Sequence, residues 1–181
     1  MNNSSIVNVV GGGSIHRELN LPQVYQDFPD GDLEYEPEAF AALVIRYDSP
    51  KGTVMLYTSG KYSLAGARSI EQAYEVNTRF VESMEQMLGH EITDQEFEVR
   101  YLVGTADFGT ELNLNTIIPI LGVEQIEYEP EQFPGLFYRP PGRDWFSLLF
   151  GSGKVVFSGV KDEKELEQAY REVENKISQI L

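Results

Sequence analysis

The chain has 181 residues, of which 14 are Lys or Arg and 29 are Asp or Glu, so its formal net charge is −15. It contains no cysteine, which excludes a disulfide framework, thiolate zinc sites, iron–sulfur clusters and a cysteine nucleophile. No stretch approaches the roughly 18 apolar residues of a membrane span, and the polar start MNNSS is unlike a signal peptide. We therefore expect a soluble cytoplasmic protein without a membrane partner, which does not hold nucleic acid by general basicity.

The first half of the chain reads as a strand-rich segment closed by one long helix. A strand is expected at about 6–11 and a short helix near 20–27. Short β-branched or aromatic runs separated by Pro and Gly then predict four strands, around 33–36, 41–47, 53–58 and 61–66. Apolar residues that recur at spacings of three and four predict the closing helix at about 69–88.

The second half repeats this order. A strand is expected at about 97–105 and a short helix at 113–121. Four strands follow, around 126–129, 135–139, 145–150 and 154–158. The closing helix is predicted at about 162–180, with Asp162 as its N-cap and Glu165 at the capping-box position.

The similarity of the two halves indicates an internal duplication with an offset of 93 residues. Tyr35–Phe40 recurs as Tyr128–Phe133. Three further matches share the offset without a gap: Glu18–Leu21 with Glu111–Leu114, Ser59–Lys61 with Ser152–Lys154, and Gly66 with Gly159. We predict two repeats, 1–90 and 91–181, that join in one α+β sheet. Both long helices would cover one face, leaving the other face for a partner.

Matched cations and aromatic residues mark that open face. Arg46 pairs with Arg139, Lys61 with Lys154 and Arg68 with Lys161, and four of these six cations lie in or beside the predicted strands. Acidic residues instead concentrate on the long helices. This segregation fits a polyanionic ligand, although charge alone leaves equally open that the pairs are relics of duplication on solvated strand ends. Phe40 matches Phe133 and Tyr57 matches Phe150. Aromatic rings at strand ends beside cations favour wedges that stack on something flat over ordinary core residues.

Enzyme chemistry has little support. His16 and His90 are isolated in the sequence, and no pair of carboxylates stands out. Gly11-Gly-Gly13 does not continue as a phosphate-binding motif, so it reads as a flexible strand end. We expect no catalytic residues, no metal site and no cofactor.

Four segments carry a resemblance to a known family: Glu129–Arg139, Leu148–Lys154, Glu111–Asn115 and Asn8–Val10. Together with the duplication, they resemble the TATA-box-binding protein family, archaeal type. The resemblance implies a saddle, in which about ten antiparallel strands form a curved sheet with its concave face on DNA and four helices on the convex face. It also implies a transcription initiation factor that binds and bends TATA-like promoter DNA through the minor groove.

The resemblance assigns roles to individual residues. The wedge positions fall on Phe40, Tyr57, Phe133 and Phe150. The phosphate-contacting positions fall on Arg46, Lys61, Arg139 and Lys154. The centre and floor of the DNA face fall on Asn8, Tyr101, Val10, Val103, Val156 and Ser158. The surface for transcription factor B, which recruits RNA polymerase, falls on Glu129 and Glu131.

The sequence departs from the family pattern mainly in its first half. Tyr57 replaces a Phe, Ser63 a Val and Ala65 a Thr, and Tyr101 replaces the second central Asn. We therefore expect weaker or altered TATA preference with the factor-B surface intact, as in a divergent paralogue. An alternative is a regulatory interaction protein that binds factor B but binds DNA weakly. We expect either protein to be nucleoid-associated in an archaeal cell.

Overall fold

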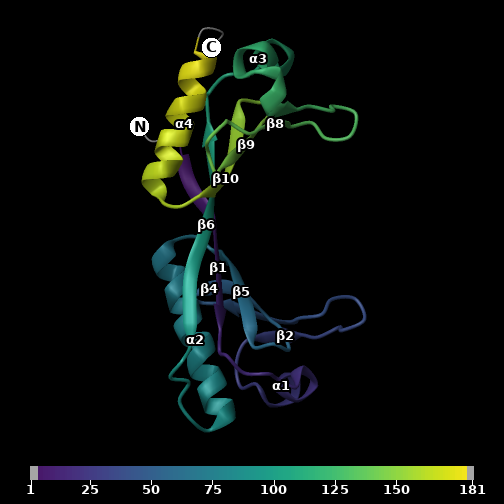
Figure 1. The fold of residues 1–181 in the computed structure, drawn as a ribbon, viewed down its shortest axis with the longest axis vertical. Helices are drawn as coiled ribbons and strands as arrows, with labels where there is room; N and C mark the ends of the chain where they lie inside the picture. The colour runs from purple at the N-terminus through teal and green to yellow at the C-terminus, as the bar shows by residue number, and fades with distance from the viewer. Residues whose placement is uncertain (1–3, 179–181) are drawn as a thin grey trace. The chain divides into compact units, whose positions relative to one another are not determined.

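The N-terminal unit of the structure comprises Asn8–Arg100. This computed structural model describes residues 4–178 of the chain. The elements follow the predicted order (Figure 1): β1 (Ser4–Ser14), α1 (Leu21–Asp27), β2 (Asp32–Glu34), β3 (Leu43–Asp48), β4 (Lys51–Leu56), β5 (Lys61–Ala67) and α2 (Ile70–Leu88). In this unit, β1 and β4 are the elements whose predicted bounds differ most. Ser4–Ser14 extends beyond the predicted 6–11 at both ends, because Gly11–Gly13 continue the strand, and Lys51–Leu56 begins and ends two residues before the predicted 53–58.

The C-terminal unit comprises Tyr101 onward, together with the start of β1 up to Val7. Its elements repeat the order: β6 (Glu96–Asp107), α3 (Leu114–Leu121), a 3-10 turn η1 (Val123–Gln125), β7 (Ile126–Glu127), β8 (Leu136–Tyr138), β9 (Phe146–Leu149), β10 (Lys154–Val160) and α4 (Glu163–Ile177). Residues 179–180 of the predicted closing helix lie outside the described part of the chain. The first residues of β1, up to Val7, belong to the C-terminal unit, and the first residues of β6, up to Arg100, belong to the N-terminal unit. The repeat boundary expected at 90/91 stays a prediction.

The described strands form one ten-stranded sheet in the order β2-β3-β4-β5-β1-β6-β10-β9-β8-β7. Every pairing with a described register is antiparallel. The order is symmetric about β1 and β6, as expected when each repeat contributes the same five strands. With four α-helices in the described chain, the architecture is the predicted α+β class.

Side-chain caps fix where the two long helices begin. The Ser69 Oγ accepts a hydrogen bond from the Gln72 N–H at 3.0 Å, and Asp162 Oδ1 accepts one from the Glu165 N–H at 2.7 Å. Asp162 is thus the predicted N-cap. The Glu165 carboxylate accepts from the N–H of Lys161, one residue before the cap, at 2.7 Å. The predicted capping box therefore differs in one bond, because Glu165 accepts from the residue before the N-cap and not from the N-cap itself.

In the N-terminal unit, α2 packs on β4 and β5. Val54 and Leu64 on the strands and Val76 and Phe80 on the helix are fully buried. The helix lies so close to β4 that a Cβ at Gly52 would come within 2.9 Å of the Val76 side chain. Burial of apolar surface contributes about 25 cal/mol per Å², so the packing of these side chains is what mainly holds the helix on the sheet. The opposite face of both strands is left without a helix of this unit.

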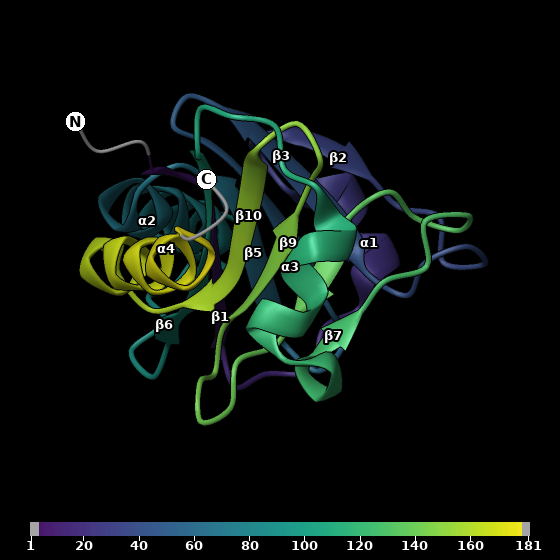
Figure 2. The same cartoon turned by 90° about the horizontal axis from the view of Figure 1, so that it is seen from above.

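The C-terminal unit is built in the same way. Figure 2 shows α4 along one side of β10. Leu166 of α4 reaches β6, where a Cβ at Gly104 would lie 2.4 Å from its side chain. Trp145 and Phe157 are buried and pack edge to face, with ring centroids 5.7 Å apart. The helical side of the sheet is thus a closed apolar core in each unit.

The glycines Gly11–Gly13 are not the flexible strand end that the sequence suggested. They lie inside β1 and pair with β5. A Cβ at Gly11 would lie 2.5 Å from the Phe97 ring, and one at Gly13 would lie 2.4 Å from the Tyr62 ring. These two rings stack at 6.3 Å, and burial raises the pKa of Tyr62 to about 12. The missing side chains thus allow close packing of aromatic rings and do not confer mobility.

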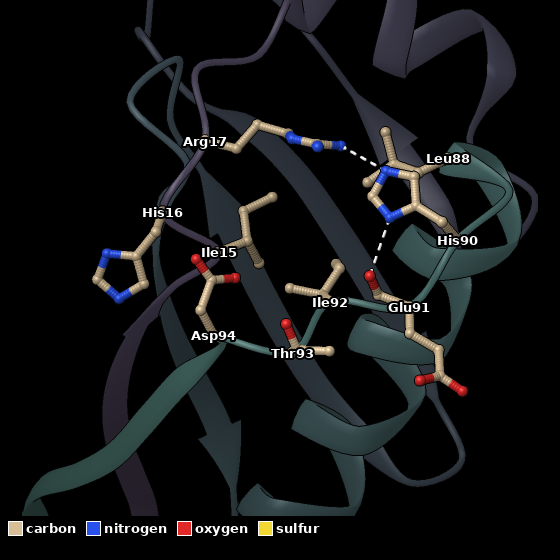
Figure 3. Close-up of a pocket in the computed structure, with 9 residues that line it drawn as sticks. All are labelled: Ile15, His16, Arg17, Leu88, His90, Glu91, Ile92, Thr93 and Asp94. Atoms are coloured by element: carbon tan, nitrogen blue, oxygen red, sulfur yellow. Dashed lines mark hydrogen bonds between the residues drawn. The ribbon is translucent and has the colours of Figure 1, made fainter.

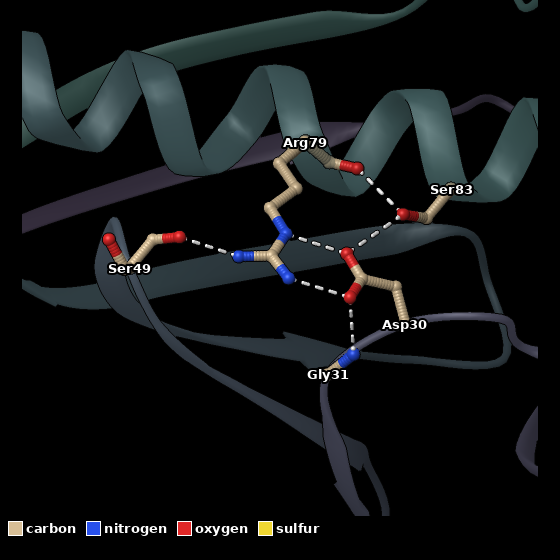
Figure 4. Close-up of polar contacts among 5 residues, drawn as sticks. All are labelled: Asp30, Gly31, Ser49, Arg79 and Ser83. Carbon is tan, nitrogen blue, oxygen red and sulfur yellow. Dashed lines mark hydrogen bonds and ion pairs between the residues drawn. The ribbon is translucent and has the colours of Figure 1, made fainter.

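A polar clasp fastens α2 to two loops of the N-terminal unit (Figure 4). The Arg79 guanidinium donates to both carboxylate oxygens of Asp30, at 2.6 and 2.7 Å, and to the Ser49 carbonyl at 2.7 Å. It also lies 4.8 Å from the ring centre of Tyr47, whose pKa is raised by burial. Hydrogen bonds from Arg79 hold the pKa of Asp30 below its usual range. The matched residue of the second repeat is Glu172, so the clasp is not duplicated.

We expect Asp30→Asn to destabilise the protein by about 1–2 kcal/mol at neutral pH, since it removes the charge from a partly exposed, charge-assisted pair. A carboxyl group with a depressed folded-state pKa stabilises the fold above its unfolded value of about 3.9, and this stabilisation is lost as the pH falls further. Denaturant unfolding should therefore show a gap between wild type and variant at pH 7 that closes in acid. Asp48→Asn, at an exposed residue without an ion pair in the described chain, is the control. A gap of equal size at every pH would contradict this account.

Candidate nucleic-acid interface

The face of the N-terminal unit opposite α2 is lined mostly by small or weakly polar side chains. Side chains alternate along β4 and β5, so that Thr53, Met55, Ser63 and Ala65 are half-buried between fully buried core residues. Thr53 lies opposite Ala65, and Met55 lies opposite Ser63. Cross-strand partners share a face, so these four residues form one continuous floor. We call this floor and its counterpart in the C-terminal unit the open faces.

Two aromatic rings stand at the edge of this open face. The N–H of Phe40 donates to the Glu36 carbonyl at 2.9 Å, which closes the turn that presents the ring. Tyr57 begins the hairpin that ends at Lys61, and its N–H donates to the Lys61 carbonyl at 2.9 Å. The rings meet edge to face, with centroids 6.4 Å apart. Phe40 remains 45% exposed, so it is not a core residue.

The open face of the C-terminal unit carries more apolar and aromatic residues. Val156 and Ser158 of β10 pair with Leu148 and Phe146 of β9. Phe146 stacks on Phe137 of β8 at 4.7 Å. The matching positions of the N-terminal unit are Ser63, Ala65, Met55, Thr53 and Val44. As predicted from the sequence, the second repeat has the fuller apolar face.

The aromatic pair of the C-terminal unit repeats the first pair in detail. The N–H of Phe133 donates to the Glu129 carbonyl at 2.9 Å, and that of Phe150 donates to the Lys154 carbonyl at 3.0 Å. The rings meet at 6.0 Å, again edge to face, and Phe133 is 47% exposed. Gly135 lies directly beneath, since its Cβ would come within 2.9 Å of both rings. The matched residue of the first repeat is Ala42, so this closer seat exists only here.

Each hairpin that joins a wedge residue to a lysine contains a glycine that its turn requires. Gly60 and Gly153 have φ values of +78° and +89°, which favour glycine. A Cβ at either position would lie 2.1 Å from a backbone carbonyl, that of Arg17 or Thr110. The glycine of the motif Ser-Gly-Lys is therefore needed for the turn that places a lysine four residues after a wedge residue.

The predicted phosphate contacts differ in their surroundings. Lys61, Arg139 and Lys154 form no ion pair within the described chain, and Arg139 lies over the Phe137 and Phe146 rings at 5.3 and 5.4 Å. Arg46 instead pairs with Glu34 at 2.7 Å. Both partners are about half exposed, so the pair is weak and a phosphate can compete for Arg46. By contrast, several cations near α2 and α4 are held by acids, as in Arg143–Glu172 and Lys161–Asp144.

The central positions also differ between the repeats. Asn8 accepts a hydrogen bond from the Gly66 N–H through its Oδ1 at 2.6 Å, which leaves its amide N–H₂ group to donate elsewhere. Its counterpart Tyr101 has no amide and is 37% exposed. Val10 and Val103 are half-buried beside them, one in each unit. The replacement thus exchanges an oriented donor for an exposed ring.

The acidic residues assigned to a protein partner lie in the Phe133 turn. Glu129 and Glu131 are both exposed. Glu129 also lines a pocket of about 400 Å³ with Gln132, Phe133 and Leu148. The second repeat therefore offers an acidic rim beside a partly apolar hollow.

The two histidines do not form a reactive pair. They line one pocket of about 300 Å³, and Figure 3 shows their rings on opposite sides of it. His90 contacts the Arg17 guanidinium at 3.0 Å and the Glu91 carbonyl at 2.9 Å, whereas His16 pairs with Glu96 at 3.3 Å. The described residues contain no group of three His, Asp or Glu placed to hold a metal ion. Nor is any described helix long and apolar enough to cross a bilayer.

Comparison with known proteins agrees with this arrangement. The family profile described as "Transcription factor TFIID (or TATA-binding protein, TBP)" matches the chain twice, at residues 3–87 and 96–180. The two matches are offset by 96 − 3 = 93 residues, which is the repeat offset. The chain belongs to the TATA-box-binding protein family. The predicted family is thereby confirmed.

Relatives of this family match over almost the whole chain. "TATA-box-binding protein E" of Halobacterium salinarum is 39% identical over 97% of this chain and 94% of its own length. The "TATA-box-binding protein" of Thermoplasma volcanium is 38% identical over 97% of this chain and 95% of its own. The solved structure of Methanococcus jannaschii TBP superposes with a TM-score of 0.80 at 37% identity, covering 98% of this chain and 99% of that one. The predicted fold class is thus confirmed.

Three contributors to the open faces escaped the sequence reasoning. Phe146 and Phe137 lie in predicted strands without an assigned role. The alternation Phe146, Leu148, Phe150 places Phe146 on the open face, and Phe137 stacks on it from β8. Gly135 was quoted in a motif but given no role. Its contrast with Ala42 at the matched position was the available signal.

Proposed function

We propose that the chain is an archaeal transcription initiation factor that binds TATA-like promoter DNA through the minor groove and bends it. Each repeat would insert one aromatic pair, Phe40 with Tyr57 or Phe133 with Phe150, at a base step. The exposed aromatic pair at the edge of each open face carries this proposal. The minor groove distinguishes A·T from G·C but little else, so such a surface selects sequences that deform easily. Partial unstacking by apolar wedges then bends the duplex away from the protein.

The distribution of charge supports DNA as the ligand despite the net charge of −15. Lys61 and Lys154 end the hairpins that begin at Tyr57 and Phe150, and Arg139 lies over Phe137 and Phe146. None of these three cations has an acidic partner in the described chain. The acids near α2 and α4 instead take up other cations, such as Arg79 and Arg143. Free cations placed beside wedges can neutralise phosphates on both sides of a widened groove. We also propose nucleoid association on this basis. The repeat boundary that we propose at 90/91 is supported instead by the two family matches at 3–87 and 96–180.

We further propose that Glu129 and Glu131 bind transcription factor B, which brings RNA polymerase to the promoter. The exposure of both carboxylates supports a protein contact at this turn. The matched turn of the first repeat keeps Glu36 and Glu38, but it has Ala39 at the position of Gln132 in the second repeat.

The test is selection of binding sites from a random duplex pool at several salt concentrations. We expect enrichment of A·T-rich sites containing flexible TA steps, with affinity falling as salt rises. Recovery of an unbiased pool at every salt concentration would contradict minor-groove recognition.

A second candidate is the regulatory protein that binds factor B but holds DNA poorly. The ion pair between Arg46 and Glu34 and the loss of a central amide at Tyr101 favour it. A gel-shift titration on TATA DNA, with and without factor B, separates the two readings. A shift with the protein alone supports the initiation factor. No shift in either series at micromolar protein leaves only the regulator.

A further inference from the structure

One arginine lies on the open face of the N-terminal unit outside every assigned role. Gly12 of β1 pairs with Ser63 of β5, and Ser63 pairs with Met55, so an outward Cβ at Gly12 would stand on this face. The position of that Cβ lies 2.6 Å from the guanidinium carbon of Arg100. The Arg100 side chain therefore lies flat over the strand, in space that only a glycine leaves free. Its repeat partner is Val7, so the arrangement occurs once in the chain.

The guanidinium is available to a ligand. Arg100 is exposed, and within residues 4–178 it forms neither an ion pair nor a side-chain hydrogen bond. It lines a groove of about 500 Å³ together with Lys61, Glu96 and Glu98. Glu96 and Glu98 balance the charges of Lys61 and Arg100 there, so the groove has no excess of positive charge that would draw a phosphate to Arg100. Neutral hydrogen-bond acceptors are therefore the better match for the five N–H donors of Arg100.

We propose that Arg100 reads base edges in the minor groove and rejects G·C pairs beneath the N-terminal unit, an inference that rests on the proposed DNA binding. A·T pairs present only acceptors in this groove, adenine N3 and thymine O2, whereas guanine adds the N2 amino donor. A guanidinium over the groove floor gains hydrogen bonds from the first pattern and faces a repelling donor in the second. Arginine also favours the negative potential of narrow A·T-rich grooves.

The proposal explains the composition of this half of the face. The first repeat has Ser63 and Ala65 where the second has Val156 and Ser158. A smaller and more polar floor beside Gly12 leaves room for a guanidinium and lowers the cost of keeping it hydrated. On this proposal, Arg100 restores the selectivity for A·T pairs that is lost with the apolar floor, and Gly12 leaves the space that its guanidinium occupies.

The test compares four proteins on a panel of duplexes: wild type, Arg100→Ala, Gly12→Ala and, as a matched loss of charge, Arg68→Ala. Arg68 is an exposed cation beyond the end of β5 without an ion pair in the described chain. The panel replaces each A·T pair of the selected site in turn by G·C or by inosine–cytosine, which lacks the guanine amino group. Fluorescence anisotropy gives the affinities.

For wild type we expect one or two positions where G·C binds roughly 5- to 100-fold more weakly than inosine–cytosine, the range for loss of a good base contact. Arg100→Ala should abolish the difference at those positions only. Gly12→Ala should do the same with the charge unchanged, because its Cβ displaces the guanidinium, while Arg68→Ala should keep the wild-type profile.

Two results would overturn the inference alone: a wild-type profile in Arg100→Ala, or an equal loss on every duplex, which is the mark of a phosphate contact. Failure of the wild type to bind any duplex would instead remove the proposed function, and the inference with it.

Discussion

Phe133→Ala is expected to reduce DNA bending more than Phe40→Ala. The two rings have nearly equal exposure, 47% and 45%, and nearly equal partner distances, so the turns themselves do not separate them. The residues around the two rings, however, differ. Phe133 rests over Gly135 beside Phe150, on a face that continues into the Phe137–Phe146 stack. Phe40 has Tyr57 as its partner, whose hydroxyl must find water or a polar group between bases.

The measurement is fluorescence transfer between dyes on the two ends of a duplex. Stacking of a base on an aromatic ring contributes about 1–3 kcal/mol, so we expect Phe133→Ala to weaken binding by roughly 5- to 150-fold as well as to straighten the DNA. Both rings are solvent-exposed, so thermal unfolding of the two variants should match wild type. Equal losses of bending in Phe40→Ala and Phe133→Ala would contradict the asymmetry.

Glu131→Arg is expected to abolish recruitment of factor B while leaving binary DNA affinity unchanged or slightly improved. Reversal of a charge at an interface rim leaves a like-charge contact that costs several kcal/mol if the partner is basic there. The same change removes a negative charge near DNA, which explains the sign of the effect on affinity.

The repeat offers a matched control, because Glu38 occupies the position of Glu131 in the first half. Glu38→Arg adds the same charge at the corresponding turn and should leave the ternary complex intact. Gel shifts with and without factor B report both complexes. A ternary complex that survives Glu131→Arg would remove the assignment of this surface.

The sequence predicted the fold well, and the reason is the duplication. One offset aligned strands, helices and turn glycines in two copies, so each weak signal was read twice. Both long helices begin within one residue of the expected position, because Ser69 and Asp162 are strong side-chain caps. The end of β1 was misread because three consecutive glycines usually signal flexibility. Here they lie against Phe97, Tyr62 and Arg100, which come from other parts of the chain.

The site was harder to predict than the fold, because pairing between side chains is not a local property. Arg46 and Arg139 are equivalent in the sequence, yet one is held by Glu34 and the other lies over two aromatic rings. Similarly, the resemblance places Asn8 on the DNA face, but only its bond to Gly66 fixes which end of the amide remains free. Arg100 is matched by Val7 and not by a second cation, so a search for symmetric pairs of cations passes over it.

The central claim is that the ring pairs enter the DNA stack, and base unstacking tests it most directly. A 2-aminopurine placed in turn at each step of the selected duplex becomes brighter where a neighbouring base is unstacked. We predict increased emission at two steps, one lost in Phe40→Ala and the other lost in Phe133→Ala. Bound DNA that shows no increase at any step would contradict the account.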